Sequence, residues 1–306
     1  MSRDDTDLES LAEARALFEE LRPFLRGVAY RMLGTHCEVD DILQDAFLRL
    51  DRIRVRELSS PRSYLAQLVT RLCIDHLRSA RVRRENYVGP WLPEPIVEEG
   101  AFAPPMPPDE VSAMREDLSL ALMFALERLS PLERAAFILH DVFDLDYADI
   151  AETLGREPAA CRQLAARGRK HIREQRPRFA PSSADGHALL GAFASAAMSG
   201  DLEHLQTLLA EGVVFASDGG GKAKAATRVV TGPQNVAKLL IGIVTKHYAD
   251  GQAVTSPALV NGQPGFVVRE NGRVTQAMSV DIHEGLIVGV YSVRNPDKLR
   301  HLNVMN

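Results

Sequence analysis

Arginine, lysine and glutamine side chains concentrate in the segment between residues 156 and 178. The segment holds eight lysines and arginines against Glu157 and Glu174, so eight minus two gives a local charge of +6. Such cations bind phosphate groups, and arginine and glutamine also hydrogen-bond to base edges in the DNA major groove. The candidate DNA-contacting residues are Arg162, Gln163, Arg167, Arg169, Lys170 and Arg173. The same charges also fit a helical hairpin whose basic face is only solvated.

The residues around this basic face predict a helix-turn-helix. A short helix is expected over residues 147–154, followed by a turn at Gly155 and a second helix that begins at Pro158. Facing away from the charges is a stripe of apolar and small residues: Cys161, Leu164, Gly168 and Ile172. One buried stripe and one basic face suit a helix that enters the major groove. Gly168 is a local weakness, since glycine in mid-helix costs about 1 kcal/mol relative to alanine.

Few residues have the types and spacing that catalysis or metal binding needs. The three cysteines are far apart and form no CxxC or Cys/His cluster, which argues against a zinc site and a disulfide framework. The loop DGGGK (218–222) lacks the spacing of a nucleotide-binding P-loop. The possible acids and bases are Asp218, Asp281, His283, Tyr248 and Tyr291, and the sequence places no second catalytic residue at a spacing that would support any of them. We therefore expect no enzyme site, no metal and no cofactor.

The periodicity of the chain predicts two helical modules followed by an α+β domain. Residues 8–84 and 109–176 have helical spacing, whereas the proline-rich segment 87–108 is predicted to be an extended linker. Beyond a second boundary at 177–186, short β-branched runs are joined by pairs typical of tight hairpin turns. These pairs are Asn261-Gly262, Asn271-Gly272 and Glu284-Gly285.

Composition favours a soluble protein of a reducing compartment. A chain of 306 residues that is 45% hydrophobic can form two or three domains with separate cores. The acidic, amphipathic N-terminus differs from a signal peptide, and no apolar run reaches the ~20 residues of a membrane span. We expect a cytoplasmic protein that does not contact membranes.

Two surfaces of opposite charge are predicted in the N-terminal helices. Asp41 and Asp45 lie four residues apart on one helix face, with Asp40 and Gln44 beside them. Residues 71–84 instead carry five arginines against one aspartate, a local charge of +4.

Together these motifs resemble the extracytoplasmic-function (group IV) sigma factors of the sigma-70 family. The matching stretches are RPFLRGVAYRMLG (22–34), DDILQDAFLRL (40–50), SPRSYLAQLVTRLCIDHLRSARVRR (60–84) and the helix-turn-helix. The resemblance implies a σ2 module that binds core RNA polymerase and melts the promoter −10 element. It also implies a σ4 module that reads the −35 element. The implied partners are promoter DNA and core polymerase, through its β′ coiled-coil and β flap.

The resemblance also implies roles for individual residues. The polymerase-binding residues would be Asp40, Asp41, Gln44, Asp45, Leu48 and Arg49. The −10 element, held as a single strand by stacking and a cationic groove, would meet Arg52, Arg54, Arg56, Arg71, Arg78, Arg81, Arg83 and Arg84. The −35 element would meet the basic face of the second helix of the helix-turn-helix.

Four further stretches resemble the subgroup that carries a SnoaL-like extension, related to nuclear-transport-factor-2-like folds. They are YVGPWLPEP (87–95), SDGGGK (217–222), VNGQP (260–264) and RNPDKL (294–299). Ala223 and Lys224 depart from the pattern, since a β-branched residue and proline are expected there. The implied organisation is σ2 over 1–86, the linker over 87–108, σ4 over 109–178 and a cone-shaped SnoaL-like regulatory domain over 179–306.

The stretch WLPEP holds the only tryptophan of the chain between prolines that stiffen it. A rigid aromatic anchor loses little entropy on docking, so we predict that Trp91, Leu92 and Pro93 dock on the C-terminal domain. The predicted docking site consists of Asp218, Gly219, Gly220, Gly221, Lys222, Asn295, Pro296, Asp297 and Lys298. Such docking would regulate the sigma factor in cis.

Alternative functions remain open from the sequence. The C-terminal domain could bind an unidentified small molecule that tunes activity, or turn one over. A conventional repressor or activator would instead bind duplex DNA without polymerase, which the acidic helix at 40–50 argues against.

Overall fold

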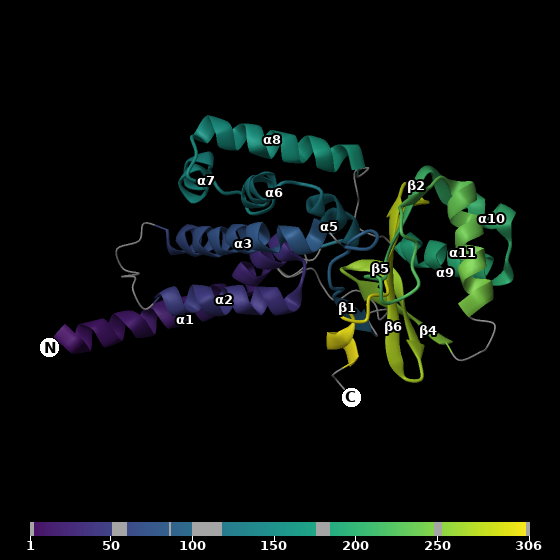
Figure 1. Cartoon of the computed structure of the whole chain (residues 1–306), viewed down its shortest axis with the longest axis horizontal. Helices are drawn as coiled ribbons and strands as arrows, with labels where there is room; N and C mark the ends of the chain where they lie inside the picture. Colours follow the sequence, from purple (N-terminus) through teal and green to yellow (C-terminus); the bar gives the residue numbers. More distant parts are fainter. Residues whose placement is uncertain are drawn as a thin grey trace. The chain divides into compact units, whose positions relative to one another are not determined.

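The computed structural model describes residues 3–50, 60–85, 87–99, 118–175, 184–247 and 253–303. The chain divides into two compact units, coloured along the sequence in Figure 1. Unit 1 comprises Met1–Glu85 and Leu126–Ile172, and unit 2 comprises Asn86–Ala125 and Arg173–Asn306. The segment predicted to be a linker therefore belongs, where it is described, to the same unit as the C-terminal domain.

Unit 1 begins with amphipathic helices that bury their apolar stripes against one another. They are α1 (Arg3–Leu33), α2 (His36–Leu50) and α3 (Pro61–Glu85). Phe18, Leu25, Leu43 and Leu65 are almost fully buried between them. Gly34, in the left-handed region with φ 77°, separates α1 from α2.

The predicted helix-turn-helix is present in the same unit. It consists of α6 (Pro131–Phe137), the π-helix η2 (Ile138–Val142), α7 (Tyr147–Leu154) and α8 (Pro158–Gln175). Ser130 and Glu133 form a capping box at the start of α6. Gly155, with φ 60°, ends α7, and Pro158 begins α8, so both local predictions are confirmed.

Gly168 has a packing role that the sequence did not reveal. A Cβ added to Gly168 would lie 3.2 Å from the Phe137 Cβ and 3.3 Å from the Glu133 carbonyl oxygen. Its missing side chain therefore lets α8 cross close to α6, and the residue predicted as a weakness is a contact point between helices.

Within the described residues, unit 2 is built on one sheet in the order β1-β4-β5-β6-β7-β2-β3. The strands are β1 (Val97–Glu99), β2 (Leu209–Asp218), β3 (Val230–Thr231), β4 (Ala253–Val260), β5 (Gln263–Glu270), β6 (Arg273–His283) and β7 (Leu286–Val293). Neighbouring strands are antiparallel except for β2 and β7. Both residues of the three predicted hairpin pairs have positive φ, which confirms those turns.

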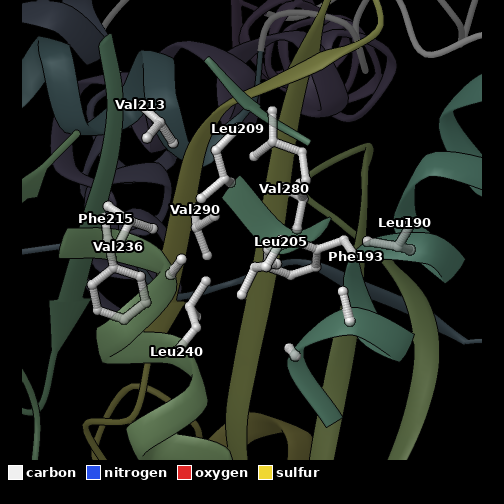
Figure 2. Packing of buried hydrophobic residues seen from close by; sticks show 14 of the residues in the cluster. Leu190, Phe193, Leu205, Leu209, Val213, Phe215, Val236, Leu240, Val280 and Val290 are labelled. Carbon is white, nitrogen blue, oxygen red and sulfur yellow. The ribbon is translucent and has the colours of Figure 1, made fainter. Parts of the chain in front are cut away.

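The helices α9 (Ala184–Ser199), α10 (Leu202–Thr207) and α11 (Pro233–His247) cover one face of this sheet (Figure 1). Phe193, Leu205, Phe215 and Leu240 belong to the core between these helices and the strands (Figure 2). The predicted α+β domain is therefore confirmed, because its sheet packs its apolar residues against helices on one side.

The opposite face of the sheet has a second core. Leu92 of the predicted linker packs there with Leu120 of α5 (Leu120–Glu127), with Tyr291 and Val293 of β7, and with Leu299, which precedes the 3₁₀ helix η3 (Arg300–Asn303). The sheet is thus apolar on both faces, which explains why β7 has almost no polar alternation. Among the described residues, no helix is long and apolar enough to cross a membrane.

Candidate functional site

The basic face of α8 displays the residues predicted to contact the −35 element. Arg162, Gln163, Arg167, Lys170 and Arg173 are exposed, and Arg169 is half-buried. This arrangement follows from the burial of Cys161, Gly168 and Ile172 on the other side of the helix. The helix therefore presents donors of hydrogen bonds and positive charge on a single surface.

Two arginines of this basic face are held by neighbouring side chains. The Arg169 guanidinium donates to both carboxylate oxygens of Asp141, at 2.8 and 3.0 Å. These hydrogen bonds raise the pKa of Arg169 further above its usual value. The Arg162 guanidinium carbon lies 5.5 Å from the centre of the Tyr147 ring. Such contacts restrict the rotamers of both arginines before any ligand binds.

The predicted polymerase-binding surface is an exposed side of α2. All six predicted residues are exposed there: Asp40, Asp41, Gln44, Asp45, Leu48 and Arg49. The Leu48 side chain is 59% exposed among them, and Arg26 of α1 donates to the Asp40 carboxylate at 2.6 Å. An exposed leucine surrounded by carboxylates suits a contact with a basic, partly apolar protein surface.

The residues predicted to meet the −10 element are only partly described. Arg71 donates from Nε to the Thr153 carbonyl at 3.0 Å and from Nη2 to the Glu152 carbonyl at 2.6 Å. It therefore bonds the last carbonyls of α7, which helix geometry leaves without partners. Arg78 forms an exposed ion pair with Asp75 at 3.5 Å. Arg81, Arg83 and Arg84 lie in the last turns of α3, whereas Arg52, Arg54 and Arg56 lie outside the described residues.

Arg134 of α6 is a second connecting arginine, and sequence reasoning missed it. Its guanidinium donates to the Met32 carbonyl at 2.7 Å, the Leu126 carbonyl at 2.8 Å and the Glu127 carboxylate at 2.7 Å. The residue is 3% exposed. Its only signal in the sequence is a single cation beside the apolar residues Ala135 and Ala136 of α6. In this arrangement Arg71 and Arg134 join the helix-turn-helix to α3 and α1.

The stretch around WLPEP is bound to unit 2 by what we call the linker clamp: Tyr87, Trp91 and Leu92 with Asp218, Asn295 and Lys298. The Asp218 carboxylate accepts from the Tyr87 hydroxyl at 2.6 Å, the Leu92 amide at 2.8 Å and the Lys298 ammonium at 2.8 Å. Lys298 also donates to the Leu92 carbonyl, and Asn295 donates to the Tyr87 hydroxyl at 2.8 Å. Both main-chain polar groups of Leu92 are therefore held by one buried ion pair.

The tryptophan of WLPEP docks on the cation of this pair. The Lys298 ammonium lies 3.8 Å from a ring centre of Trp91 and 5.0 Å from that of Tyr87, both within cation–π distance. Burial, followed by the nearby charge of Asp218, raises the pKa of Tyr87. Its hydroxyl therefore stays protonated and remains a donor to Asp218 over the usual pH range.

The DGGGK loop approaches the clamp so closely that side chains would collide. A Cβ on Gly220, which has φ 57°, would lie 2.2 Å from the Asn295 amide nitrogen. A Cβ on Gly219 would lie 2.3 Å from the Ala223 carbonyl oxygen. Gly219 and Gly220 thus allow a tight turn and a close approach to Asn295.

The remaining predicted docking residues lie at the edge of the clamp. Lys222 pairs with Asp297 in an exposed ion pair, and Gly221 lies in the left-handed region beside them. Pro93 is buried, whereas Pro296 is exposed.

Three contacts of the same segment were not predicted. The Asn261 carboxamide oxygen accepts from the Ile96 amide at 3.0 Å, and a His301 ring nitrogen lies 2.9 Å from the Pro95 carbonyl oxygen. Residues 97–99 form β1 and pair with β4. The predicted linker therefore adds an edge strand to the sheet, which its prolines at 90, 93 and 95 did not suggest.

The α9–α11 face of the sheet holds a cavity of about 810 Å³. Its lining contains no acidic, histidine, cysteine or tyrosine residue from the described parts of the chain. Asp218 bonds to the clamp on the other face, Tyr291 packs in the second core, and Asp281 and His283 are outside the lining. Tyr248 lies outside the described residues. No cluster of metal-binding side chains was found in those parts either, and the three cysteines are free thiols.

Comparison with known proteins identifies the two helical modules. Residues 17–83 match the family model "Sigma-70 region 2", and residues 119–172 match "Sigma-70, region 4". The chain is 36% identical over 289 residues to the ECF RNA polymerase sigma factor SigJ of Mycobacterium tuberculosis, covering 92% of this chain and 91% of SigJ. It is 32% identical over 281 residues to the probable ECF sigma factor SigI of the same species, covering 91% and 92%.

The fold agrees with this relationship. The crystal structure of Mycobacterium tuberculosis SigJ matches with a TM-score of 0.72 at 34% identity, covering 93% of this chain and 98% of SigJ. The match thus extends over both helical modules and the C-terminal α+β unit. The chain belongs to the extracytoplasmic-function sigma factors of the sigma-70 family, which direct RNA polymerase to promoters.

Proposed function

We propose that the C-terminal unit of this sigma factor controls its activity in cis by holding residues 87–99. The observation that carries the proposal is the linker clamp, in which the buried Asp218–Lys298 pair bonds both the amide and the carbonyl of Leu92. These residues connect region 2 to region 4. Holding them limits the positions that the two regions can take relative to each other when they engage a promoter.

The contacts within unit 1 support a closed arrangement of regions 2 and 4. Arg71 bonds carbonyls of α7, so its guanidinium is occupied while the helix-turn-helix rests on α3. Arg134 likewise holds α6 on the end of α1. In our proposal these contacts are exchanged for polymerase and −10 contacts when the clamp releases the linker. The clamp thereby biases the equilibrium between closed and polymerase-bound forms.

We further propose how the exposed surfaces divide the work of initiation. The acidic surface of α2 binds the β′ coiled-coil of core polymerase, and region 4 contacts the β flap. The basic face of α8 contacts the −35 element, with Arg162 and Gln163 reading bases and Lys170 bonding phosphates. Arg52, Arg54 and Arg56, together with the arginines at the end of α3, contact the −10 strand. The C-terminal unit acts by binding and not by catalysis, since the described cavity lining offers no carboxylate, histidine, cysteine or tyrosine to move a proton.

Promoter-directed transcription with purified core RNA polymerase tests the proposal. The full chain is compared with Trp91→Ala, which removes the ring over Lys298, and with Val254→Ala, an exposed apolar residue of β4 outside the clamp. Trp91→Ala is expected to change the amount of specific transcript severalfold and to increase protease cleavage around residues 87–99. Val254→Ala should match the unaltered chain in both assays.

The outcomes separate the two parts of the proposal. Absence of specific initiation by the unaltered chain would contradict promoter direction itself. Specific initiation with identical transcript levels and cleavage for the Trp91→Ala chain would refute control by the clamp and leave the sigma activity in place.

A further inference from the structure

The cavity between the sheet and helices α9 and α11 has a polar end and an apolar end. Phe193, Phe215, Leu240 and Phe266 line the apolar part, and the first three are labelled in the core of Figure 2. At the other end lie Ser217 of β2, Gln276 of β6, Ser292 of β7 and Arg294, which directly follows β7. The volume of about 810 Å³ is in the range of small-molecule sites in proteins.

Strand register brings the polar residues of this cavity together. Ser217 is paired with Ser292 across β2 and β7. Ala277 is paired with Val293 across β6 and β7, so the neighbouring Gln276 lies opposite Arg294. Because residues two apart on a strand share a face, Ser292 and Arg294 both project toward the cavity. Polar groups from three adjacent strands therefore converge at one end of a largely apolar space.

Two buried polar atoms at this end have no hydrogen-bond partner within the described residues. They are the Ser292 hydroxyl oxygen and Arg294 Nε, and Ser292 is only 1% exposed. Buried polar groups in folded proteins are almost always paired, because leaving one without a partner costs free energy. The Arg294 Nη1 is already positioned, since it donates to the Lys224 carbonyl at 2.8 Å. The Arg294 guanidinium is thus held in place through Nη1, and its Nε can donate to a hydrogen-bond acceptor of a ligand.

The charge of the lining determines which kind of molecule fits. Lys224, Lys246 and Arg294 are cationic, and no described aspartate or glutamate lines the cavity to neutralise them. An anion is therefore attracted, and a cation is repelled. The phenylalanines and leucines at the other end favour an aromatic or aliphatic body.

We propose that this cavity binds a small amphipathic anion, with an apolar body against Phe193, Phe215 and Phe266 and an acidic head group at Ser292 and Arg294. The inference does not depend on the proposed control by the linker clamp. It assigns the C-terminal unit a ligand of defined chemical class.

The test uses two probes that share an aromatic body and differ in charge. These probes are 8-anilinonaphthalene-1-sulfonate and the uncharged N-phenyl-1-naphthylamine, titrated into the full chain by fluorescence with stoichiometry checked by calorimetry. The sulfonate should bind once per chain and about tenfold or more tighter than the neutral probe, the effect expected of a charge-assisted hydrogen bond. Arg294→Met should remove that preference, whereas Lys238→Met, which alters an exposed cation of α11 outside the lining, should keep it.

A second pair of variants tests the location. Gly191 of α9 lines the cavity, and a Cβ added there meets nothing within 4 Å. Gly191→Phe should weaken both probes, and Gly191→Ala should weaken neither. Equal affinity for the two probes, failure of both to bind stoichiometrically, or sulfonate binding that survives Arg294→Met and Gly191→Phe would each overturn the proposal.

Discussion

The ammonium group of Lys298 takes part in most contacts of the linker clamp. It pairs with Asp218, donates to the Leu92 carbonyl and lies under the ring of Trp91. The side chains of the ion pair are 7% and 0% exposed, so water does not replace a lost partner. A buried pair of this kind is costly to assemble, and removing one member leaves the other charge without compensation.

Lys298→Met is therefore expected to lower the free energy of unfolding by about 3–5 kcal/mol, the range for breaking a buried ion pair. Because Trp91 is the only tryptophan, its emission during urea denaturation reports directly on this region. The matched control is Lys222→Met, whose ion pair with Asp297 is exposed and should contribute about 0–1 kcal/mol. The double variant with Asp218→Asn and Lys298→Met should lose much less free energy of unfolding than the sum of the losses of the two single variants. Additive losses would mean that the two charges do not depend on each other.

At the scale of elements, the close crossing of α6 and α8 in region 4 limits the size of the residue that fits at position 168. The basic side of α8 is free to carry charge because the other side is anchored on α6, where Gly168 meets the Glu133 carbonyl. A rigid backbone neighbour cannot move aside as a flexible side chain can. The helical preference for alanine is thus opposed by overpacking at this position.

Gly168→Ala is expected to destabilise unit 1 by on the order of 1 kcal/mol, because the strain of overpacking exceeds the gain in helix propensity. Gly191→Ala in α9 is the matched change, since its Cβ meets no atom within 4 Å, and it should stabilise the protein by up to about 1 kcal/mol. Calorimetric unfolding of both variants measures the difference. A stabilising Gly168→Ala would show that α6 and α8 separate readily.

At the scale of the whole molecule, charge is distributed very unevenly. The chain carries a net charge of −5, yet residues 156–178 carry +6. The mean charge therefore hides the surface that would meet DNA, and salt should act on promoter binding through this local patch.

Lys170→Met should weaken promoter binding by the polymerase complex similarly for all promoter sequences, because a phosphate contact carries no base specificity. The slope of log affinity against log salt concentration should fall by about 1, the value for one lost phosphate contact. Lys238→Met, on an exposed face of α11, is expected to leave the slope unchanged. A slope unaffected by Lys170→Met would remove Lys170 from the proposed DNA interface.

Local features of the chain were predictable because their physical causes lie within a few residues. The limits of α7, the turn at Gly155 and the start of α8 follow from backbone preferences of glycine and proline. The Asn-Gly pairs of the hairpins follow from the positive φ that type I′ turns require. The exposed faces of α2 and α8 follow from helical periodicity, which places apolar residues on the opposite side.

Sequence by itself thus determined the family, the element types and the charged faces. Only the tertiary structure decided that Arg71 bonds α7 and that Arg134 bonds the end of α1, since their partners lie 82 and 102 residues away. It also decided that Asp218 faces the clamp while the adjacent Ser217 faces the cavity. The physical reason is that hydrogen-bond partners and cavity walls depend on which elements pack together, and no periodicity within one element encodes its neighbours.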